Sequence, residues 1–92
     1  MIKSFKSTKT RRLFETGQSR RFGAIADAAV RKLVQLEAAA TLEFLRSPPG
    51  NRLEALRGDR AGQFSIRIND QWRVCFRWTD AGPEDVEIVD YH

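Results

Sequence analysis

The apolar residues of this chain change their spacing halfway along it, and that change limits the folds open to it. Between Phe22 and Leu36 they recur at the three- and four-residue intervals of a helix, whereas between Phe64 and Trp78 they alternate as in half-buried strands. The prolines and glycine of residues 47–51 divide the two halves. Helices followed by an antiparallel meander predict an α+β fold, with the N-terminal helices packed on one face of the sheet and the other face free.

Local signals set the expected ends of these elements. Ser7 or Thr8 is placed to cap a first helix that ends near Thr16, and Gly17 can close it in a left-handed conformation. The second helix is expected to have four or more turns. The full expectation is a short strand over 2–5, helices over 8–16, 22–36 and 42–46, strands over 64–68, 72–78 and 85–91, and a turn over 80–83.

The length of 92 residues suits one domain, which we expect to span 1–92. No stretch approaches the roughly 18 apolar residues of a membrane span, and the first residues lack the apolar run of a signal peptide. A single cysteine, Cys75, and a single histidine, His92, cannot supply a typical zinc site or an intramolecular disulfide. We therefore expect a cytoplasmic protein without metal or cofactor, in which Cys75 is a small packing residue.

The positive charge of the chain is unevenly distributed. The net charge is +4, but residues 1–37 carry nine Lys or Arg against three acids, and residues 79–92 carry five acids and no Lys or Arg. Residues 51–78 hold six arginines and three acids. A basic surface of this kind favours a polyanion such as nucleic acid, and the alternative is solvated charge that only keeps the domain soluble.

Parity fixes the register of the first long hairpin. The apolar residues of its two strands must share one face, which excludes a two-residue loop and favours the three-residue loop 69–71 with Ile68 opposite Trp72. That register places Arg67 opposite Arg73, and a five-residue loop would make these two arginines diagonal neighbours on the same face.

Two arginines on one sheet face suggest an anion site. Each guanidinium can donate two hydrogen bonds to phosphate oxygens, so Arg67 and Arg73 are expected to converge on a phosphate. The alternative is that each arginine pairs with a nearby acid such as Glu87 or Asp59.

Several short motifs resemble one known family over the whole chain. The motifs are Met1 to Phe5, Leu13-Phe14-Glu15-x-Gly17, Arg57 to Gly62, Ser65-Ile66-Arg67, Trp72-Arg73-Val74 and Asp90-Tyr91-His92. They resemble the HigB toxins of the RelE/ParE superfamily, also called killer or plasmid-maintenance proteins. Residues 47–54 are similar to the proteobacterial subgroup that includes GraT.

This resemblance implies a RelE-like fold and a toxin of a type II toxin–antitoxin system. It implies metal-independent cleavage of messenger RNA in the A site of the 30S ribosomal subunit, with the ribose 2′-oxygen attacking the adjacent phosphate. The implied partner is a HigA-type antitoxin with a helix-turn-helix domain, through which any contact with operator DNA would be indirect. No membrane partner is implied.

The resemblance also implies a set of site residues. Arg67 and Arg73 would bind the scissile phosphate and its developing charge, and Arg57 would assist them or bind a neighbouring phosphate. Tyr91 would stack on a base or position the 2′-hydroxyl, unless it is only an edge aromatic. Either Asp90 or His92 would be the general acid or base, unless His92 is only a terminal residue. The flanking residues expected to contact RNA are Glu54, Arg60, Gln71 and Arg77.

Three positions depart from the family's pattern. Glu54 stands where some relatives carry histidine, Gln71 where some carry asparagine, and Arg57 where many carry lysine. Two alternatives to a nuclease therefore remain open. One is a ParE-like protein that acts on DNA gyrase, and the other is an RNA-binding relative without catalytic activity.

Overall fold

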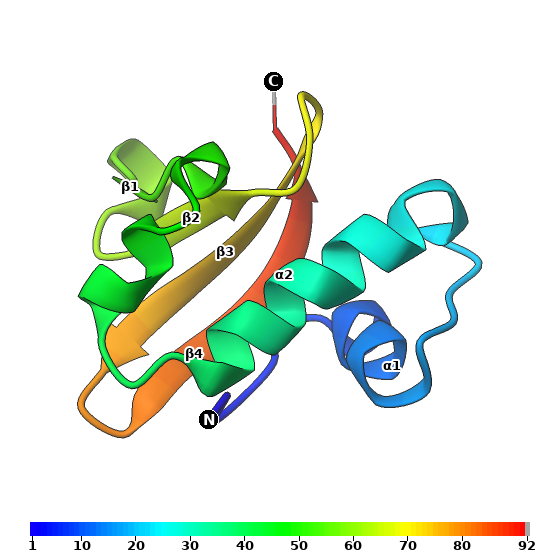
Figure 1. The fold of residues 1–92 in the computed structure, drawn as a ribbon, viewed down its shortest axis with the longest axis horizontal. Coiled ribbons are helices and arrows are strands. Elements are labelled where there is room, and N and C mark those ends of the chain that lie inside the picture. Colours follow the sequence, from blue (N-terminus) through cyan, green and yellow to red (C-terminus); the bar gives the residue numbers. More distant parts are fainter. Residues whose placement is uncertain (92) are drawn as a thin grey trace.

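The computed structural model describes residues 1–91 and has an α+β architecture (Figure 1). Over those residues the helices are α1 (Thr8–Thr16) and α2 (Ala26–Ala38), and the strands are β1 (Glu54–Ala55), β2 (Phe64–Arg67), β3 (Trp72–Thr79) and β4 (Gly82–Asp90). The strands form one antiparallel sheet in the order β1-β2-β3-β4. Neither helix of the described chain is long and apolar enough to cross a membrane.

The first helix has the ends that the sequence predicts. The Ser7 side chain accepts a hydrogen bond from the backbone N–H of Thr10 at 3.2 Å, and Gly17 closes the helix with φ 74°. The second helix begins later than expected, at Ala26. A 3-10 turn over Gly23–Ile25 precedes it, because no side chain there caps an α-helix. The short helical piece over Leu42–Arg46 is a 3-10 helix.

The core lies between the two helices and one face of the sheet. Figure 1 shows α2 lying over the sheet, and α1 packs against α2 and β4. A buried hydrogen bond of 3.1 Å, from the backbone N–H of Ile88 to the Thr10 hydroxyl, fixes α1 on β4. The core side chains with no exposed surface include Leu13, Leu33, Leu36, Leu45, Ile66, Val74, Phe76 and Val86.

The hairpin register deduced from parity is confirmed. Arg67 lies opposite Arg73 and Ser65 lies opposite Cys75. The side chain of Asn69 accepts hydrogen bonds from the backbone N–H groups of Gln71 and Trp72, both at 2.8 Å, and so holds the three-residue loop. Figure 1 shows this loop at the same end of the molecule as the C-terminus.

Two expected strands differ from those of the structure, and one observed strand was not expected. Residues 2–5 form no strand, although they run beside the edge of β4 that β3 leaves free. Their pairing with that edge is limited to one isolated parallel bridge between Phe5 and Val86. The last strand starts at Gly82 rather than at residue 85, because the turn needs only Asp80 and Ala81. The two-residue strand β1 was not expected, since it is too short to show a period.

The sheet face away from the helices is not free, contrary to the expectation. Ser65 and Cys75 on this face have no exposed surface, and Arg73 is only 8% exposed. Strand β1 pairs with β2 at the edge of the sheet, and Arg60 reaches over this face to Glu87 on β4, with 2.9 Å between nitrogen and oxygen. The segment 52–63 therefore turns an open face into a half-buried polar site.

Candidate functional site

The half-buried polar site is organised around Arg73. Its guanidinium Nη1 donates to the Ser65 hydroxyl, forms an ion pair of 3.2 Å with Glu54 Oε1, and lies 3.4 Å from the carbonyl oxygen of Arg52. The same guanidinium lies over the ring of Tyr91, with 4.9 Å from its central carbon to the ring centroid. Contacts on several sides hold the cation in one position before any ligand binds.

Glu54 joins Arg73 to Tyr91. The Tyr91 hydroxyl donates a hydrogen bond of 3.0 Å to Glu54 Oε1, the same oxygen that pairs with Arg73. This hydrogen bond to a carboxylate raises the pKa of Tyr91. Tyr91 therefore remains a neutral hydroxyl donor near pH 7, and the residue as a whole is 41% exposed.

A surface hollow opens beside this cluster. It has a volume of about 670 Å³ and is lined by Glu54, Ala55, Leu56, Arg57, Arg60 and Tyr91. We call it the Tyr91 hollow. Arg57 on its rim is exposed and makes no ion pair or hydrogen bond through its side chain within the described part of the chain. A ligand entering the hollow would meet the free guanidinium of Arg57, the guanidinium of Arg60, which is paired with Glu87, and the aromatic ring of Tyr91.

Arg67 and Arg73 do not converge, although their Cα atoms are paired. Arg73 leans along β2 to Ser65, whereas Arg67 forms a close ion pair with Asp70 in the hairpin loop. Like-charge repulsion between facing guanidiniums and the nearby carboxylates account for this divergence. Each arginine therefore pairs with a local acid, but neither with Glu87 nor with Asp59, the partners considered from the sequence.

The remaining candidates lie around this centre. The amide of Gln71 donates to Asp90 at 3.1 Å, and its backbone carbonyl accepts from the N–H of Tyr91 at 2.6 Å, so the hairpin loop holds the C-terminal residues. Arg77 lies further along the face and pairs with Asp85 at 3.6 Å. His92 lies outside the described residues. Within residues 1–91, no three Cys, His, Asp or Glu side chains are grouped so as to hold a metal ion.

Sequence reasoning missed two members of the site. Ser65 holds Arg73, and its position opposite Cys75 in the predicted register was the only signal for it. The backbone carbonyl of Arg52 had no signal, because its position depends on a left-handed conformation (φ 45°) at a non-glycine residue.

Burial of Cys75 on this face leads to a prediction about alkaline pH. Its thiol has no exposed surface, and burial raises its pKa from 9.0 to about 11. The unfolded thiol ionises first, so this group's contribution to stability is complete below pH 9 and is lost as the pH rises toward 11. Urea denaturation should show about 2 kcal/mol less stability at the upper end of this window.

Cys75→Ala is the matched control, because it removes the thiol and leaves every other titrating group. The variant should show a smaller loss over the same pH range. An equal loss in both proteins would contradict a buried thiol as its source.

Comparisons with known proteins agree with the architecture. Residues 3–92 match the family model described as RelE-like toxin of type II toxin-antitoxin system HigB. The chain is 40% identical over 82 residues to Toxin HigB-1 of Vibrio cholerae, covering 87% of this chain and 86% of the relative. It is 31% identical over 93 residues to Endoribonuclease HigB of Proteus vulgaris, with complete coverage of both chains.

Similarity to a solved structure supports the fold. A YoeB/ParE toxin from Agrobacterium tumefaciens superposes with a TM-score of 0.55 at 18% identity, covering 99% of this chain and 98% of that one. The expected RelE-like fold is therefore confirmed. These matches place the chain among the RelE-like toxins of type II toxin–antitoxin systems. Within that class it belongs to the HigB family.

Proposed function

We propose that this chain is a ribosome-dependent endoribonuclease, a toxin that stops translation by cutting messenger RNA in the A site of the 30S subunit. The observation that carries the proposal is the cluster of Arg73, Glu54 and Tyr91 beside a hollow with an unpaired Arg57. A held cation next to an exposed aromatic face suits a phosphate and its neighbouring base. The name of the Proteus vulgaris relative supports the same activity.

The reaction that this site suits is an internal transesterification. The ribose 2′-oxygen loses its proton to a base and attacks the adjacent phosphorus, while the 5′-oxygen leaves and takes up a proton. The products are a 2′,3′-cyclic phosphate and a 5′-hydroxyl end. The negative charge that grows on the phosphoryl oxygens calls for fixed cations, and none of these steps requires a metal ion.

Each side chain has a proposed role in that reaction. Arg73 binds the scissile phosphate by exchanging Glu54 for phosphate oxygens, and Ser65 keeps the guanidinium in place meanwhile. Arg57 binds a phosphate at the mouth of the hollow. Tyr91 stacks on a base and donates its hydroxyl, and proton transfer falls to Asp90 or His92. The outer residues proposed to contact the message are Arg60, Arg67, Gln71 and Arg77.

The proposed partners follow from the toxin–antitoxin class. A cognate antitoxin is expected, and we propose a HigA-type protein with a helix-turn-helix domain, through which operator DNA would be bound. The chain would work as one domain over residues 1–92 at the cytoplasmic ribosome. From the resemblance of residues 47–54 we also propose that it belongs to the subgroup that includes GraT.

The test is a primer-extension map of a reporter message incubated with the purified chain, with and without translation. New 5′ ends inside codons should appear only during translation. Arg57→Ala should slow their appearance about tenfold without lowering stability, since Arg57 is exposed and loses one phosphate contact. Arg31→Ala, which removes an exposed arginine from α2, is the matched control and should cleave like the wild type.

Two other outcomes would overturn this function. Growth arrest without new 5′ ends, accompanied by inhibition of DNA supercoiling, would indicate a gyrase toxin. Ribosome binding without cleavage would indicate an RNA-binding relative that has lost its activity.

A further inference from the structure

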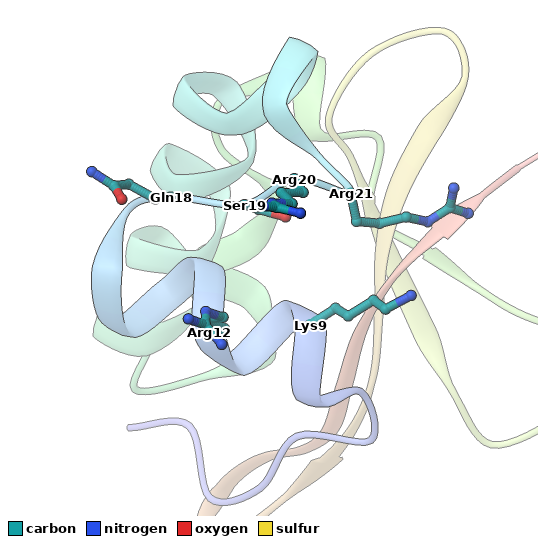
Figure 2. Close-up of a pocket in the computed structure, with 6 residues that line it drawn as sticks. All are labelled: Lys9, Arg12, Gln18, Ser19, Arg20 and Arg21. Atoms are coloured by element: carbon teal, nitrogen blue, oxygen red, sulfur yellow. The ribbon is translucent and has the colours of Figure 1, made fainter.

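A second hollow, on the helical side of the molecule, is lined by cations. It has a volume of about 880 Å³ and lies between α1 and the segment that follows it (Figure 2). We call it the α1 hollow. Its lining contains no acidic residue and consists of Lys9, Arg12, Gln18, Ser19, Arg20 and Arg21.

The backbone brings these cations together in a defined way. Lys9 and Arg12 lie three residues apart on α1 and share one exposed side of it. The left-handed Gly17 then reverses the chain, so that residues 18–21 return alongside the helix. Figure 2 shows Lys9 and Arg21 extending to the same side of the hollow.

Local hydrogen bonds hold this return segment in place. The Thr16 hydroxyl donates to the carbonyl of Arg12 at 2.8 Å and accepts from the N–H of Gln18 at 3.1 Å. The Ser19 hydroxyl accepts a hydrogen bond from the N–H of Phe22 at 3.0 Å. Phe22 is buried and packs edge-on against Trp72, with 5.6 Å between the ring centroids. The hydroxyl of Ser19 keeps its own proton to donate to a ligand.

Within the residues that the structure describes, three of the four cations of the α1 hollow make no contact that the fold uses. Lys9, Arg12 and Arg20 have no ion pair and no side-chain hydrogen bond among residues 1–91. In contrast, the arginines that lie on or over the polar face of the sheet are paired with acids: Arg60, Arg67, Arg73 and Arg77.

Arg21 and Glu15 complete the electrostatic surroundings. Arg21 lies over the rings of Phe22 and Trp72, at 5.9 and 5.6 Å, and meets no carboxylate. Glu15 lines a smaller adjoining hollow of about 400 Å³ and makes no ion pair in the described chain. One carboxylate beside four cations leaves the α1 hollow strongly positive.

We propose that the α1 hollow is a second RNA-binding site, which binds the phosphate backbone of RNA away from the site of cleavage. Each guanidinium can donate two hydrogen bonds to two phosphate oxygens, and the Lys9 ammonium adds a point charge. Ser19 and Gln18 supply neutral hydrogen-bond donors. This inference rests on the proposed function, because the second site would add affinity for the ribosome and its message. Its contribution is to binding and not to bond breaking.

The composition of the hollow favours RNA over an acidic protein. Protein interfaces centre on large apolar and aromatic side chains. The exposed large apolar residues of the described chain are Met1, Val34, Phe44 and Tyr91, and none of them lines the α1 hollow. A surface with cations and hydroxyl or amide donors but no apolar centre matches a phosphate backbone.

The α1 hollow and the Tyr91 hollow lie on opposite faces of the sheet, and both lie near its hairpin end. Trp72, under Arg21, faces the helices, whereas the next residue, Arg73, faces the polar site. Trp72 is also paired with Asp90 on β4. A single RNA or two neighbouring strands could therefore contact both sites around the hairpin end of the sheet.

The experiment compares two double variants of the full chain that remove equal charge. Arg12→Gln with Arg20→Gln empties the hollow of two cations, and Lys3→Gln with Arg31→Gln removes two exposed cations elsewhere. The probes are a fluorescein-labelled RNA hairpin and labelled poly-glutamate, each titrated over a range of salt concentrations. Thermal unfolding of both variants should match the wild type, because all four residues are exposed.

The hollow variant should bind the RNA hairpin at least about tenfold more weakly at low salt, and the slope of log affinity against log salt should fall by about 2. The control variant should stay within about twofold of the wild type. Equal RNA affinity and slope in the two variants would overturn the inference. So would a selective loss of poly-glutamate binding, which would indicate an acidic protein instead.

Cleavage of a translated message by the same preparations separates this inference from the proposed function. If the wild type cleaves and the hollow variant shows a raised KM at an unchanged kcat, both stand. If the wild type does not cleave while the hollow variant loses RNA binding, the function fails and the second site remains. If the wild type cleaves and the hollow variant has the same KM and RNA affinity, the second site fails alone.

Discussion

Arg73→Ala is expected to reduce the rate of message cleavage by about 10²–10³-fold, the usual cost of removing one fixed donor to a developing oxyanion. Arg73 is held on several sides, by Ser65, Glu54 and the Arg52 carbonyl, and its guanidinium lies over the ring of Tyr91. A guanidinium held in this way needs no reorganisation when the phosphate arrives. The measurement is the rate at which new 5′ ends appear on a translated message.

The same substitution will also destabilise the fold, so a control is needed. Removing a buried guanidinium leaves the Ser65 hydroxyl without its partner and Glu54 with the Tyr91 hydroxyl alone, which costs about 1–3 kcal/mol. Arg73→Lys keeps the charge but lacks the planar fork that binds two phosphate oxygens, and it should lose most of the activity with less loss of stability. Undiminished cleavage by a folded Arg73→Ala protein would remove Arg73 from the site.

The sheet could be predicted from the sequence because its side-chain period is an integer. A shift of one residue between Ile66 and Val74 would expose a whole apolar face, so parity excluded the two-residue loop, and the observed register is that of the favoured three-residue loop. The ends of α1 could also be predicted, because Ser7 caps the first turn with its side chain and Gly17 adopts the left-handed conformation that closes the last one. The start of α2 was not, since no capping side chain marks it.

The site was only partly predictable, because a Cα register does not fix the direction of a long side chain. Arg67 and Arg73 share a face as predicted, yet their guanidiniums turn to Asp70 and Glu54. Glu54 reaches Arg73 through β1, a strand of two residues that carries no periodic signal. Which carboxylate pairs with each arginine therefore depends on where the irregular segments lie in the fold, and the local sequence pattern does not give that position.

The α1 hollow had a signal that was too coarse to locate it. The excess of basic residues in 1–37 was visible, but solvated charge explained it equally well. Only the chain reversal at Gly17 shows that Arg12 and Arg20 line the same space.

Asn51 is the clearest example of a residue whose importance the sequence hides. It lies in the Pro/Gly-rich segment that we interpreted as a divider and as a mark of the subgroup, yet it has no exposed surface. Its amide nitrogen donates to Gln35 at 3.0 Å, to the carbonyl of Leu45 at 3.1 Å and to that of Ser47 at 3.4 Å. Its oxygen accepts from the Lys32 ammonium at 2.6 Å. One side chain thus ties α2 to the segment that leads into β1.

Asn51→Ala should therefore lower stability by about 3 kcal/mol, because it leaves several buried polar groups without a partner, and the melting temperature should fall by roughly 15 °C. Asn69→Ala is the matched control. It removes two hydrogen bonds from a half-exposed loop where water can replace them, and it should cost about 1 kcal/mol. Cleavage should also slow in the Asn51 variant below its melting temperature, since Arg52 and Glu54 follow directly and hold Arg73. Equal losses of stability in the two variants would show that Asn51 is not the anchor of this segment.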